Sequence, residues 1–323
     1  MILTKTPLRI PLAGGGTDLP IFTSKKNVGI VIPIAINQYI YTYLIKRPIN
    51  ATTLVQTGDL QEVKMNQNIR HNLIRETLKY FNIKKQIHLG FFSTMPTRSG
   101  IGSSSSLVVG LVASICKFKK LNYSKRKISE VAIRIERKIL KEKGGIQDQI
   151  SASYGGINYI KCFQNYKFKV KKINFDNSQI KFLENHLILI FSNIKRYSTN
   201  IIKTQNKKES INNYLEVRNE VKIIIETIKK KSAKDLGKIY DNHWERKKKL
   251  SLKISNSKID RIYKKILKNK YFHGGKLIGA GGGGFFLFVT SNKKKAKNYL
   301  KKNNIIFSEI KVDMKGSRLT KIS

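Results

Sequence analysis

The run Ser-Gly-Ile-Gly-Ser-Ser-Ser-Ser at 99–106 carries the residue types that hold phosphate groups. Glycine lets the backbone approach a ligand closely, and serine favours the start of a helix, where free N–H groups and the helix dipole attract anions. The apolar stretch at 107–113 predicts the buried helix that follows. We therefore predict a phosphate-binding helix start made by Ser99, Gly100, Gly102, Ser103, Ser104 and Ser105.

Two more glycine-rich stretches lie at 13–18 (Ala-Gly-Gly-Gly-Thr-Asp) and 279–284 (Gly-Ala-Gly-Gly-Gly-Gly). Strand-like runs flank them, so they lack the strand–glycine–helix order of a dinucleotide-binding turn. The sequence also lacks a P-loop, in which two glycines separated by four residues precede Lys and Ser or Thr. A surface turn explains one glycine run equally well. Three runs, one of them before a helix, favour a ligand site.

In this order, the three stretches resemble the GHMP kinases, the superfamily of galactokinase, homoserine kinase, mevalonate kinase and phosphomevalonate kinase. The resemblance covers nearly the whole chain. Four strings are similar to the branch of the superfamily that acts on heptose 7-phosphate: Thr-Pro-Leu-Arg at 6–9, Ala-Gly-Gly-Gly-Thr-Asp-Leu-Pro at 13–20, Met-Pro-Thr-Arg-Ser-Gly-Ile-Gly-Ser-Ser-Ser-Ser at 95–106 and Gly-Gly-Ile-Gln-Asp-Gln at 144–149.

The resemblance assigns the reaction to two residues. Asp148 matches the aspartate that faces the acceptor hydroxyl in mevalonate kinase and galactokinase, where a carboxylate either accepts the proton or orients the hydroxyl. Arg9 stands nine positions before Asp18, as in the galactokinase motif. Its guanidinium would lower the pKa of Asp148 and stabilise charge in the transition state. The alternative for Arg9 is a surface arginine on an edge strand.

ATP and Mg²⁺ are the cofactors that the resemblance implies. It gives Ser104 a metal-ligating hydroxyl and Glu136 a metal-ligating carboxylate. Magnesium prefers oxygen ligands and keeps several waters, so one hydroxyl and one carboxylate suffice. Simple helix capping is the alternative for Ser104, and a solvated glutamate paired with Arg137 or a nearby lysine is the alternative for Glu136.

Sugar contacts are expected at the first and third glycine stretches. By analogy with galactokinase, Thr17 and Asp18 would bind sugar hydroxyls, although Asp18 also suits a turn before Pro20. The loop at 281–284 is expected beside the first stretch, near the acceptor, with a buried core turn as the alternative. The predicted substrate contacts are Gly16, Thr17, Asp18, Arg98, Lys195, Arg196, Gly282 and Gly283.

A sugar that already carries a phosphate needs a second anion site. Lys195 and Arg196 follow a strand-like run and resemble a segment of the heptose kinases. Arg98 in the serine stretch and Lys247 or Lys248 after Trp244 are further candidates, and the sequence does not choose among them.

The implied reaction is ATP-dependent phosphorylation of the anomeric hydroxyl of D-glycero-D-manno-heptose 7-phosphate to the 1,7-bisphosphate, on the way to nucleotide-activated heptose for lipopolysaccharide, capsule or S-layer glycan. Another anomeric sugar kinase, acting on galactose, fucose or an aminosugar, is the alternative among enzymes. A non-catalytic, basic nucleic-acid-binding module is the alternative from a different class. Intact Ser104, Glu136 and Asp148 argue against that module.

The chain has 64 Lys and Arg against 20 Asp and Glu, a net charge of +44. Clustered bases give nucleic-acid binders their affinity. Here the lysines are spread over the chain, their runs at 229–231, 247–249 and 293–295 lack interleaved aromatic residues, and no zinc-finger, RRM or KH signature accompanies them. Drift in composition toward Lys, Ile and Asn is the simpler interpretation of the high positive charge. A positive field would still speed the capture of ATP and sugar phosphates.

Small-molecule partners, ATP and a sugar phosphate, are therefore expected, without nucleic acid or membrane, and a homodimer is left open. The N-terminus lacks an apolar signal-peptide core. Pro33, Asn37 and Gln38 interrupt the apolar stretch at 29–45, which favours strands over a membrane span and a cytoplasmic protein. Cys116 is predicted to be a buried free thiol, and the histidines show no metal-ligand spacing with one another or with cysteine.

The elements that must position these residues are a mixture of strands and helices in two halves of the chain, which predicts an α+β fold. Strand-like runs lie at 8–12, 29–34, 39–45, 54–63 (a pair around a turn), 87–92, 155–160, 187–191 and 285–289. Helical patterns lie at 72–81, 104–118 and 124–140 and in long basic segments between 203 and 267, and a helix–strand pair ends the chain.

A Lys-rich, poorly patterned stretch at 161–184 separates two halves of the chain. The resemblance implies an N-terminal, ATP-binding domain like ribosomal protein S5 domain 2 over 1–165 and a ferredoxin-like C-terminal domain over 185–323.

Overall fold

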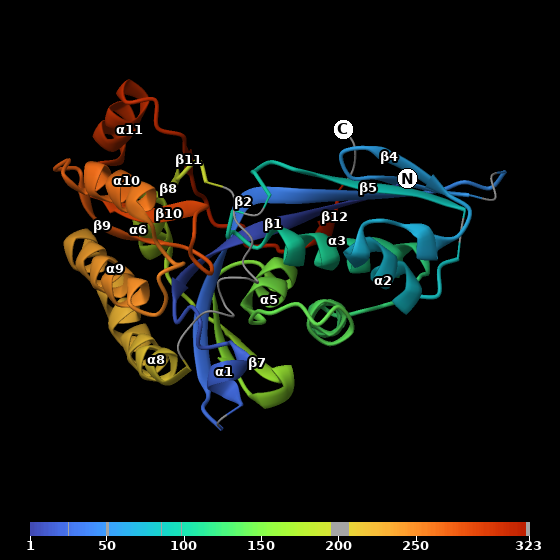
Figure 1. Ribbon diagram of the computed structural model, residues 1–323, viewed down its shortest axis with the longest axis horizontal. Coiled ribbons are helices and arrows are strands. Elements are labelled where there is room, and N and C mark those ends of the chain that lie inside the picture. The colour runs from blue at the N-terminus through green and yellow to red at the C-terminus, as the bar shows by residue number, and fades with distance from the viewer. Residues whose placement is uncertain (25, 50–51, 85, 98, 195–206, 321–323) are drawn as a thin grey trace.

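The computed structural model describes residues 1–320 except 25, 50–51, 85, 98 and 195–206. Within this part of the chain, two antiparallel-rich sheets carry helices on their faces (Figure 1). The first sheet runs to the right of Figure 1 with α2, α3 and α5 beneath it, and the second sheet lies to the left with α9, α10 and α11. This is the α+β arrangement predicted from the sequence.

The first sheet has the order β12-β1-β2-β5-β3-β4, and β6 and β7 join it through β2. Only β3 and β5 pair in parallel among the strands described. The strands are β1 (Ile2–Ala13), β2 (Gly29–Lys46), β3 (Thr53–Gln56), β4 (Leu60–Val63), β5 (Ile87–Ser93), β6 (Asn158–Cys162), β7 (Phe168–Lys172) and β12 (Arg318–Leu319).

The two strands predicted at 29–34 and 39–45 form the single strand β2. Ile36 pairs with Leu8 and Tyr39 with Pro7, so that Asn37 and Gln38 have no partner on β1. This β-bulge bends the strand without ending it. The polar pair that seemed to break the apolar pattern therefore marks a bend inside one strand.

Helices of the first half cover the inner face of this sheet. In α3, every residue from Leu107 to Val112 is buried. A Cβ on Gly110 would lie 2.9 Å from Thr6 Oγ1, so glycine lets the helix approach the sheet closely. The helices are α1 (Pro20–Thr23), α2 (Asn72–Tyr80), α3 (Ser103–Phe118), α4 (Lys125–Ile133), the π-helix η2 (Arg134–Ile139) and α5 (Gln147–Tyr154), with 3-10 turns η1 (Asn66–Asn68) and η3 (Gln164–Tyr166).

The second sheet has the order β11-β8-β10-β9 and is antiparallel throughout its described strands. These are β8 (Leu187–Phe191), β9 (Phe272–Leu277), β10 (Phe285–Thr290) and β11 (Phe307–Glu309). The helices of this half are α6 (Asn177–His186), α8 (Lys207–Lys229), α9 (Ala233–Lys248), α10 (Ser257–Leu267) and α11 (Lys293–Lys302).

Strands β8 and β10 are buried on both faces, and successive side chains enter two different cores. One face joins a large core that continues into the first half of the chain. The other face packs with Trp244 and Tyr263 in a second core. The side chains that alternate between them are Leu187, Leu189, Phe285 and Leu287 in the first core and Ile188, Ile190, Phe286 and Phe288 in the second. The two halves thus share one hydrophobic core.

The last described residues return to the first sheet. Leu319 in β12 pairs with Thr4, and Val312 forms a bridge with Ile36. Asp313 holds this return because its carboxylate accepts hydrogen bonds from Tyr39, Gly316 and Arg318. The last described residues therefore leave the proposed C-terminal domain and pair with strands of the proposed N-terminal domain. The boundaries of both domains remain predictions.

Residues 161–184 are more regular than the sequence suggested. They contain β7 and α6, and Asp176 begins α6 with a capping box in which its side chain accepts from the Gln179 backbone N–H. The prediction that this stretch is poorly patterned is therefore wrong: the lysines of β7 occupy its exposed positions, while Phe168 is buried. Its place between two domains remains a prediction.

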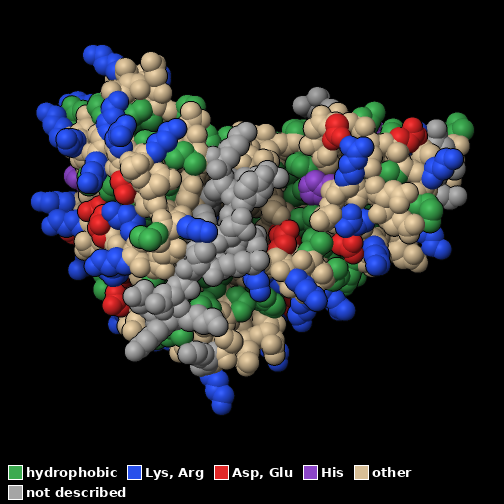
Figure 2. Space-filling view, in the orientation of Figure 1, with side chains coloured by type: hydrophobic (Ala, Val, Ile, Leu, Met, Phe, Trp, Pro, Cys, Tyr) green, Lys and Arg blue, Asp and Glu red, His purple; other side chains and the backbone are tan. Residues whose placement is uncertain are grey.

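Cys116 and Cys162 are buried free thiols, as predicted for Cys116, and burial raises the pKa of Cys116 to about 11. No helix in the described residues is long and apolar enough to cross a membrane. Lys and Arg side chains are spread over the face shown in Figure 2, densely on the side of α9, α10 and α11, with Asp and Glu among them.

Candidate active site

A cleft of about 770 Å³ brings the three glycine-rich stretches together with the second half of the chain. Gly15, Gly16 and Asp18 line it from the first stretch, and Gly279 and Ala280 from the third. The serine stretch contributes every residue predicted to hold ATP phosphates, namely Ser99, Gly100, Gly102, Ser103, Ser104 and Ser105.

The serine stretch opens helix α3 toward this cleft. Gly102 precedes the first turn with φ +81°, a left-handed conformation that glycine adopts without strain. Among the described residues, no side chain caps the helix, and the Ser103 hydroxyl is buried without a hydrogen-bond partner. The first backbone N–H groups of a sixteen-residue helix are therefore open to an anionic ligand.

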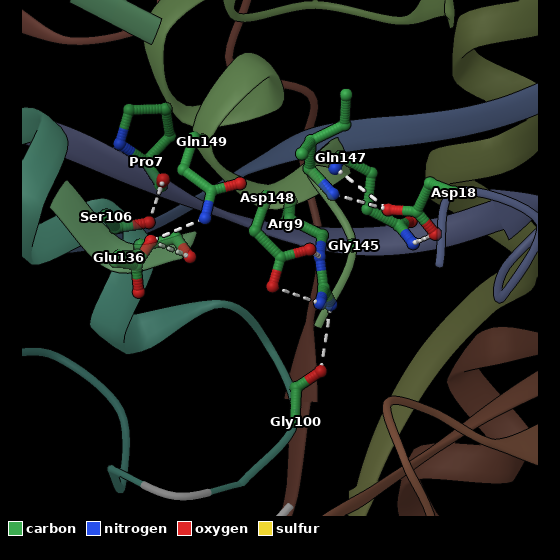
Figure 3. Close-up of polar contacts among 12 residues, drawn as sticks. Pro7, Arg9, Asp18, Gly100, Ser106, Glu136, Gly145, Gln147, Asp148 and Gln149 are labelled. Carbon is green, nitrogen blue, oxygen red and sulfur yellow. Dashed lines mark hydrogen bonds and ion pairs between the residues drawn. The ribbon is translucent and has the colours of Figure 1, made fainter. Parts of the chain in front are cut away.

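Arg9 and Asp148 form a two-point ion pair beside this helix start (Figure 3). Arg9 Nε lies 2.6 Å from Asp148 Oδ1, and the second guanidinium nitrogen lies 2.6 Å from Oδ2. The third nitrogen donates to the Gly100 carbonyl oxygen at 2.8 Å, which ties the pair to the serine stretch. Arg9 is only 6% exposed, and its backbone N–H donates to the Ile101 carbonyl, so it is not a surface arginine.

Glu136 lies on the π-helix η2 and is 1% exposed, so it is not a solvated surface glutamate. Its Oε1 accepts from Ser104 Oγ at 2.9 Å, and its Oε2 accepts from Ser105 Oγ at 2.8 Å and from Gln149 Nε2 at 2.5 Å. Arg137 points elsewhere and donates to the Gly145 carbonyl at 2.9 Å. A π-turn inside a helix often accompanies a functional side chain.

Ser104 and Glu136 fit a magnesium ion. Mg²⁺ prefers oxygen ligands, and the Ser104 hydroxyl and the Glu136 carboxylate lie side by side, joined by a hydrogen bond of 2.9 Å. In the described residues, no three His, Cys, Asp or Glu side chains gather around one point. Such an ion would thus be held by these two side chains together with phosphate oxygens and water.

Asp18 lines the cleft, but its carboxylate caps helix α5. It accepts from the backbone N–H groups of Ile146 and Gln147 at 2.8 and 3.0 Å and from the Gln147 side chain at 3.0 Å. Burial raises the pKa of Asp18 above its usual value, the nearby Asp148 charge adds to this, and the backbone hydrogen bonds oppose it. A Cβ on Gly145 would overlap this carboxylate, so the glycine is needed there.

Thr17, predicted to bind sugar hydroxyls, does not line the cleft. It is fully buried, and its hydroxyl lies 2.9 Å from the Gly14 carbonyl, the Ile30 carbonyl and the Ile30 N–H. These contacts fasten the first glycine stretch to β2. Gly16 does line the cleft, with φ +100° and its Cα against the ring of Tyr214.

The third glycine stretch packs against the serine stretch. A Cβ on Gly284 would lie 2.2 Å from the Ser99 carbonyl oxygen, to which the Phe285 N–H donates at 3.1 Å. Gly282 donates to the Ile254 carbonyl, and neither Gly282 nor Gly283 lines the cleft. We predicted this loop beside the first glycine stretch; in the described part of the chain, residues 281–285 contact Ser99 of the serine stretch, Ile194 and Ile254.

The candidates for a second anion site fall into three groups. Arg98, Lys195 and Arg196 lie outside the described residues. Lys248 contacts Glu245, Asp260 and the Trp244 ring and does not line the cleft. Lys247 lines the cleft and donates to the carbonyls of Leu277 and Gly279 at 2.9 and 2.6 Å.

Several residues in and around the cleft were given no role in the sequence analysis. Gln147 and Gln149, beside the predicted aspartate, hold Asp18 and Glu136. Lys276 on β9 and His243 on α9 line the wall made by the second half of the chain. Both residues lie inside a regular helix or strand, where the sequence alone does not distinguish a polar residue that faces a cleft from one that faces solvent.

Comparisons with known proteins agree with this geometry. Residues 70–156 match the model of the GHMP kinases N terminal domain, and residues 224–307 match GHMP kinases C terminal. The chain is 32% identical to a D-glycero-alpha-D-manno-heptose 7-phosphate kinase from Campylobacter jejuni, over 87% of this chain and 86% of that protein.

Solved structures resemble the whole chain as well. A D-glycero-D-manno-heptose 1-phosphate kinase from Bacteroides thetaiotaomicron superposes with a TM-score of 0.82 at 21% identity, covering 100% of both chains. A putative sugar kinase from Campylobacter jejuni superposes with a TM-score of 0.77 at 26% identity, covering 99% of this chain and 98% of that one.

Proposed function

Because the chain belongs to the GHMP kinase family, it is an ATP-dependent sugar kinase, and we propose that it phosphorylates the anomeric hydroxyl of D-glycero-D-manno-heptose 7-phosphate to the 1,7-bisphosphate. The observation that carries the choice of sugar is the 32% identity, over 87% of the chain, to a heptose 7-phosphate kinase. The ion pair of Arg9 with Asp148 in the cleft supports the choice of acceptor site.

In this proposal Asp148 receives the acceptor hydroxyl. Arg9 holds both carboxylate oxygens, which fixes the side chain in one orientation. Each oxygen keeps lone pairs with which it can accept the hydroxyl proton or orient the hydroxyl. The guanidinium, which is always charged, also places positive charge near the phosphoryl group in transfer.

The start of helix α3 holds the ATP phosphates in the same proposal. Its uncapped N–H groups and its dipole attract the phosphate oxygens. Ser104 and Glu136 would hold Mg²⁺, which when bound neutralises charge on the phosphates. Ser105 and Gln149 keep Glu136 in place through its second oxygen.

The product suggests the setting of the reaction. A sugar 1-phosphate is the group that nucleotidyl transfer couples to a nucleotide, so we assign the enzyme to the supply of nucleotide-activated heptose for surface glycans. ATP and sugar phosphates are metabolites of the cytoplasm, so a cytoplasmic location is part of the proposal.

ADP release with a panel of sugars and sugar phosphates tests the proposal. We expect turnover with heptose 7-phosphate, and we expect Asp148→Asn to lower kcat by about 10²- to 10⁴-fold, the usual contribution of a positioned acid or base. Turnover on a neutral hexose but not on the 7-phosphate would reject the substrate and keep the family. Full activity after removal of divalent cations would reject the Mg²⁺ site.

A further inference from the structure

Resting on the proposed function, we infer that Lys276, supported by Lys247, binds the phosphate that the acceptor sugar already carries. A sugar 7-phosphate brings a dianion into the cleft at a distance from its reacting hydroxyl. The inference concerns the wall of the cleft that the second half of the chain provides.

Lys276 is a buried cation that faces the cleft. It is 5% exposed, and its Nζ donates to the Leu12 carbonyl at 2.9 Å and lies 3.8 Å from the centre of the Tyr240 ring. Within the described residues, no carboxylate lies within ion-pair distance of this ammonium. A buried ammonium without a counter-ion is costly, and an anionic ligand would remove that cost.

Its position suits the length of the substrate. Leu12, the carbonyl partner of Lys276, lies three residues after Arg9 on β1. At the rise of a β-strand, this is about 10 Å. A seven-carbon sugar with its C1 hydroxyl at Asp148 can therefore direct its far end along β1 toward Lys276.

A second cation lies beside it. Lys247 and His243 are one turn apart on α9, and both line the cleft. Burial lowers the pKa of His243 to about 4, so the imidazole is neutral at pH 7 and offers a hydrogen bond rather than a charge. Burial also lowers the pKa of Lys276 to about 7, which a bound dianion would reverse.

The general excess of lysine does not explain Lys276. A second cavity, of about 790 Å³ between α4 and β7, is also basic, but its bases are exposed, like those spread over the surface in Figure 2. Its cationic lining residues are Arg126, Lys127, Arg134, Lys138, Lys167 and Lys169. Drift in composition adds solvated lysines at little cost, whereas a buried lysine has to be stabilised.

Calorimetric binding without ATP tests the inference separately from turnover. Heptose 7-phosphate and the same heptose without phosphate are titrated into wild type, Lys276→Met, Lys247→Met and the control Lys248→Met, whose lysine lies outside the cleft. We expect Lys276→Met to weaken binding of the 7-phosphate by about 10- to 100-fold and to leave the unphosphorylated sugar unchanged. We expect Lys247→Met to act in the same direction, and Lys248→Met to have no effect.

The outcomes separate the two proposals. The inference is overturned if Lys276→Met and Lys247→Met bind the 7-phosphate as tightly as wild type does. It is also overturned if both sugars lose the same affinity. Either result counts whether or not the enzyme phosphorylates the sugar. Binding that depends on Lys276 without phosphorylation at C1 supports the inference and rejects the proposed function. A wild-type protein that binds no sugar phosphate rejects both. Unchanged ATP binding in each variant shows that the fold is intact.

Discussion

Three carboxylates lie side by side along the start of α5, each with a different set of partners (Figure 3). Hydroxyl and amide groups hold Glu136, a guanidinium holds Asp148, and backbone N–H groups hold Asp18. A metal ion can replace the hydrogen bonds that hydroxyl groups donate to Glu136. The backbone N–H groups that donate to Asp18 are those at the start of α5, so these hydrogen bonds stabilise the helix. The same carboxylate group therefore has three different sets of partners, and its proposed role differs with them.

At the same scale, Lys276 predicts how stability depends on pH. Burial lowers the pKa of Lys276 in the folded protein to about 7, whereas its usual value in an unfolded chain is 10.5. Because the unfolded state binds more protons between these values, the free energy of unfolding rises with pH through this window and is lowest below it. We expect Lys276→Met to reduce this rise, as measured by urea unfolding at pH 6 and pH 9.

Other groups that face Lys276 set the control for this experiment. Glu220 on α8 and His243 and Lys247 on α9 interact with it or line the same wall. The pKa of His243, about 4, lies below the window, so this residue stays neutral throughout it. The same rise with pH in wild type and Lys276→Met would show that Lys276 stays charged when the protein is folded.

At the scale of elements, the contact between the third glycine stretch and the serine stretch gives a prediction. Gly284 has φ +93° and lies against the Ser99 backbone. Gly284→Ala must separate the two stretches, so we expect it to lower the free energy of unfolding by about 2 kcal/mol or more and to raise KM for ATP. Gly58→Ala is the matched control, with φ +150° and open space around it. A similar KM for ATP in both variants would contradict the prediction.

The sequence predicted elements whose pattern is local. The apolar run of β8, the hairpin of β3 and β4 around a turn, and the amphipathic α2 all appear where they were expected. Helix α5 was not predicted, because its N-terminal cap is Asp18, which lies 128 residues earlier in the chain. Strand β9 was also missed, because a glycine such as Gly274 usually indicates a turn. Here the glycine lets β9 approach α9 closely, since a Cβ on Gly274 would lie 2.1 Å from the Gly237 carbonyl oxygen.

The site was predicted where the resemblance supplied motifs. The structure brings Arg9 to Asp148 and Ser104 to Glu136, while their roles remain predictions. Lys276 had no motif, and its importance depends on burial and on a missing counter-ion, which only three-dimensional contacts reveal. Thr17 belongs to a motif, but its hydroxyl is used within the fold.

At the scale of the whole molecule, the shared core predicts cooperative unfolding. The large core takes side chains from β1 and α3 in the first half and from β8, β10 and α9 in the second. We therefore expect one unfolding transition. The fluorescence of Trp244, the chain's single tryptophan, reports the second half, and hydrogen exchange in α3 reports the first. Different denaturation midpoints for the two probes would contradict this expectation.

The two faces of β8 and β10 also restrict how such a protein can evolve. Side chains on one face belong to the large core, which takes residues from both halves of the chain, and side chains on the other face pack with α10 and α11. Exchange of the second half with that of a relative would change many side chains at once in the core that both halves build. New sugar specificities in this architecture are therefore expected to arise by point changes on the cleft wall rather than by recombination of halves.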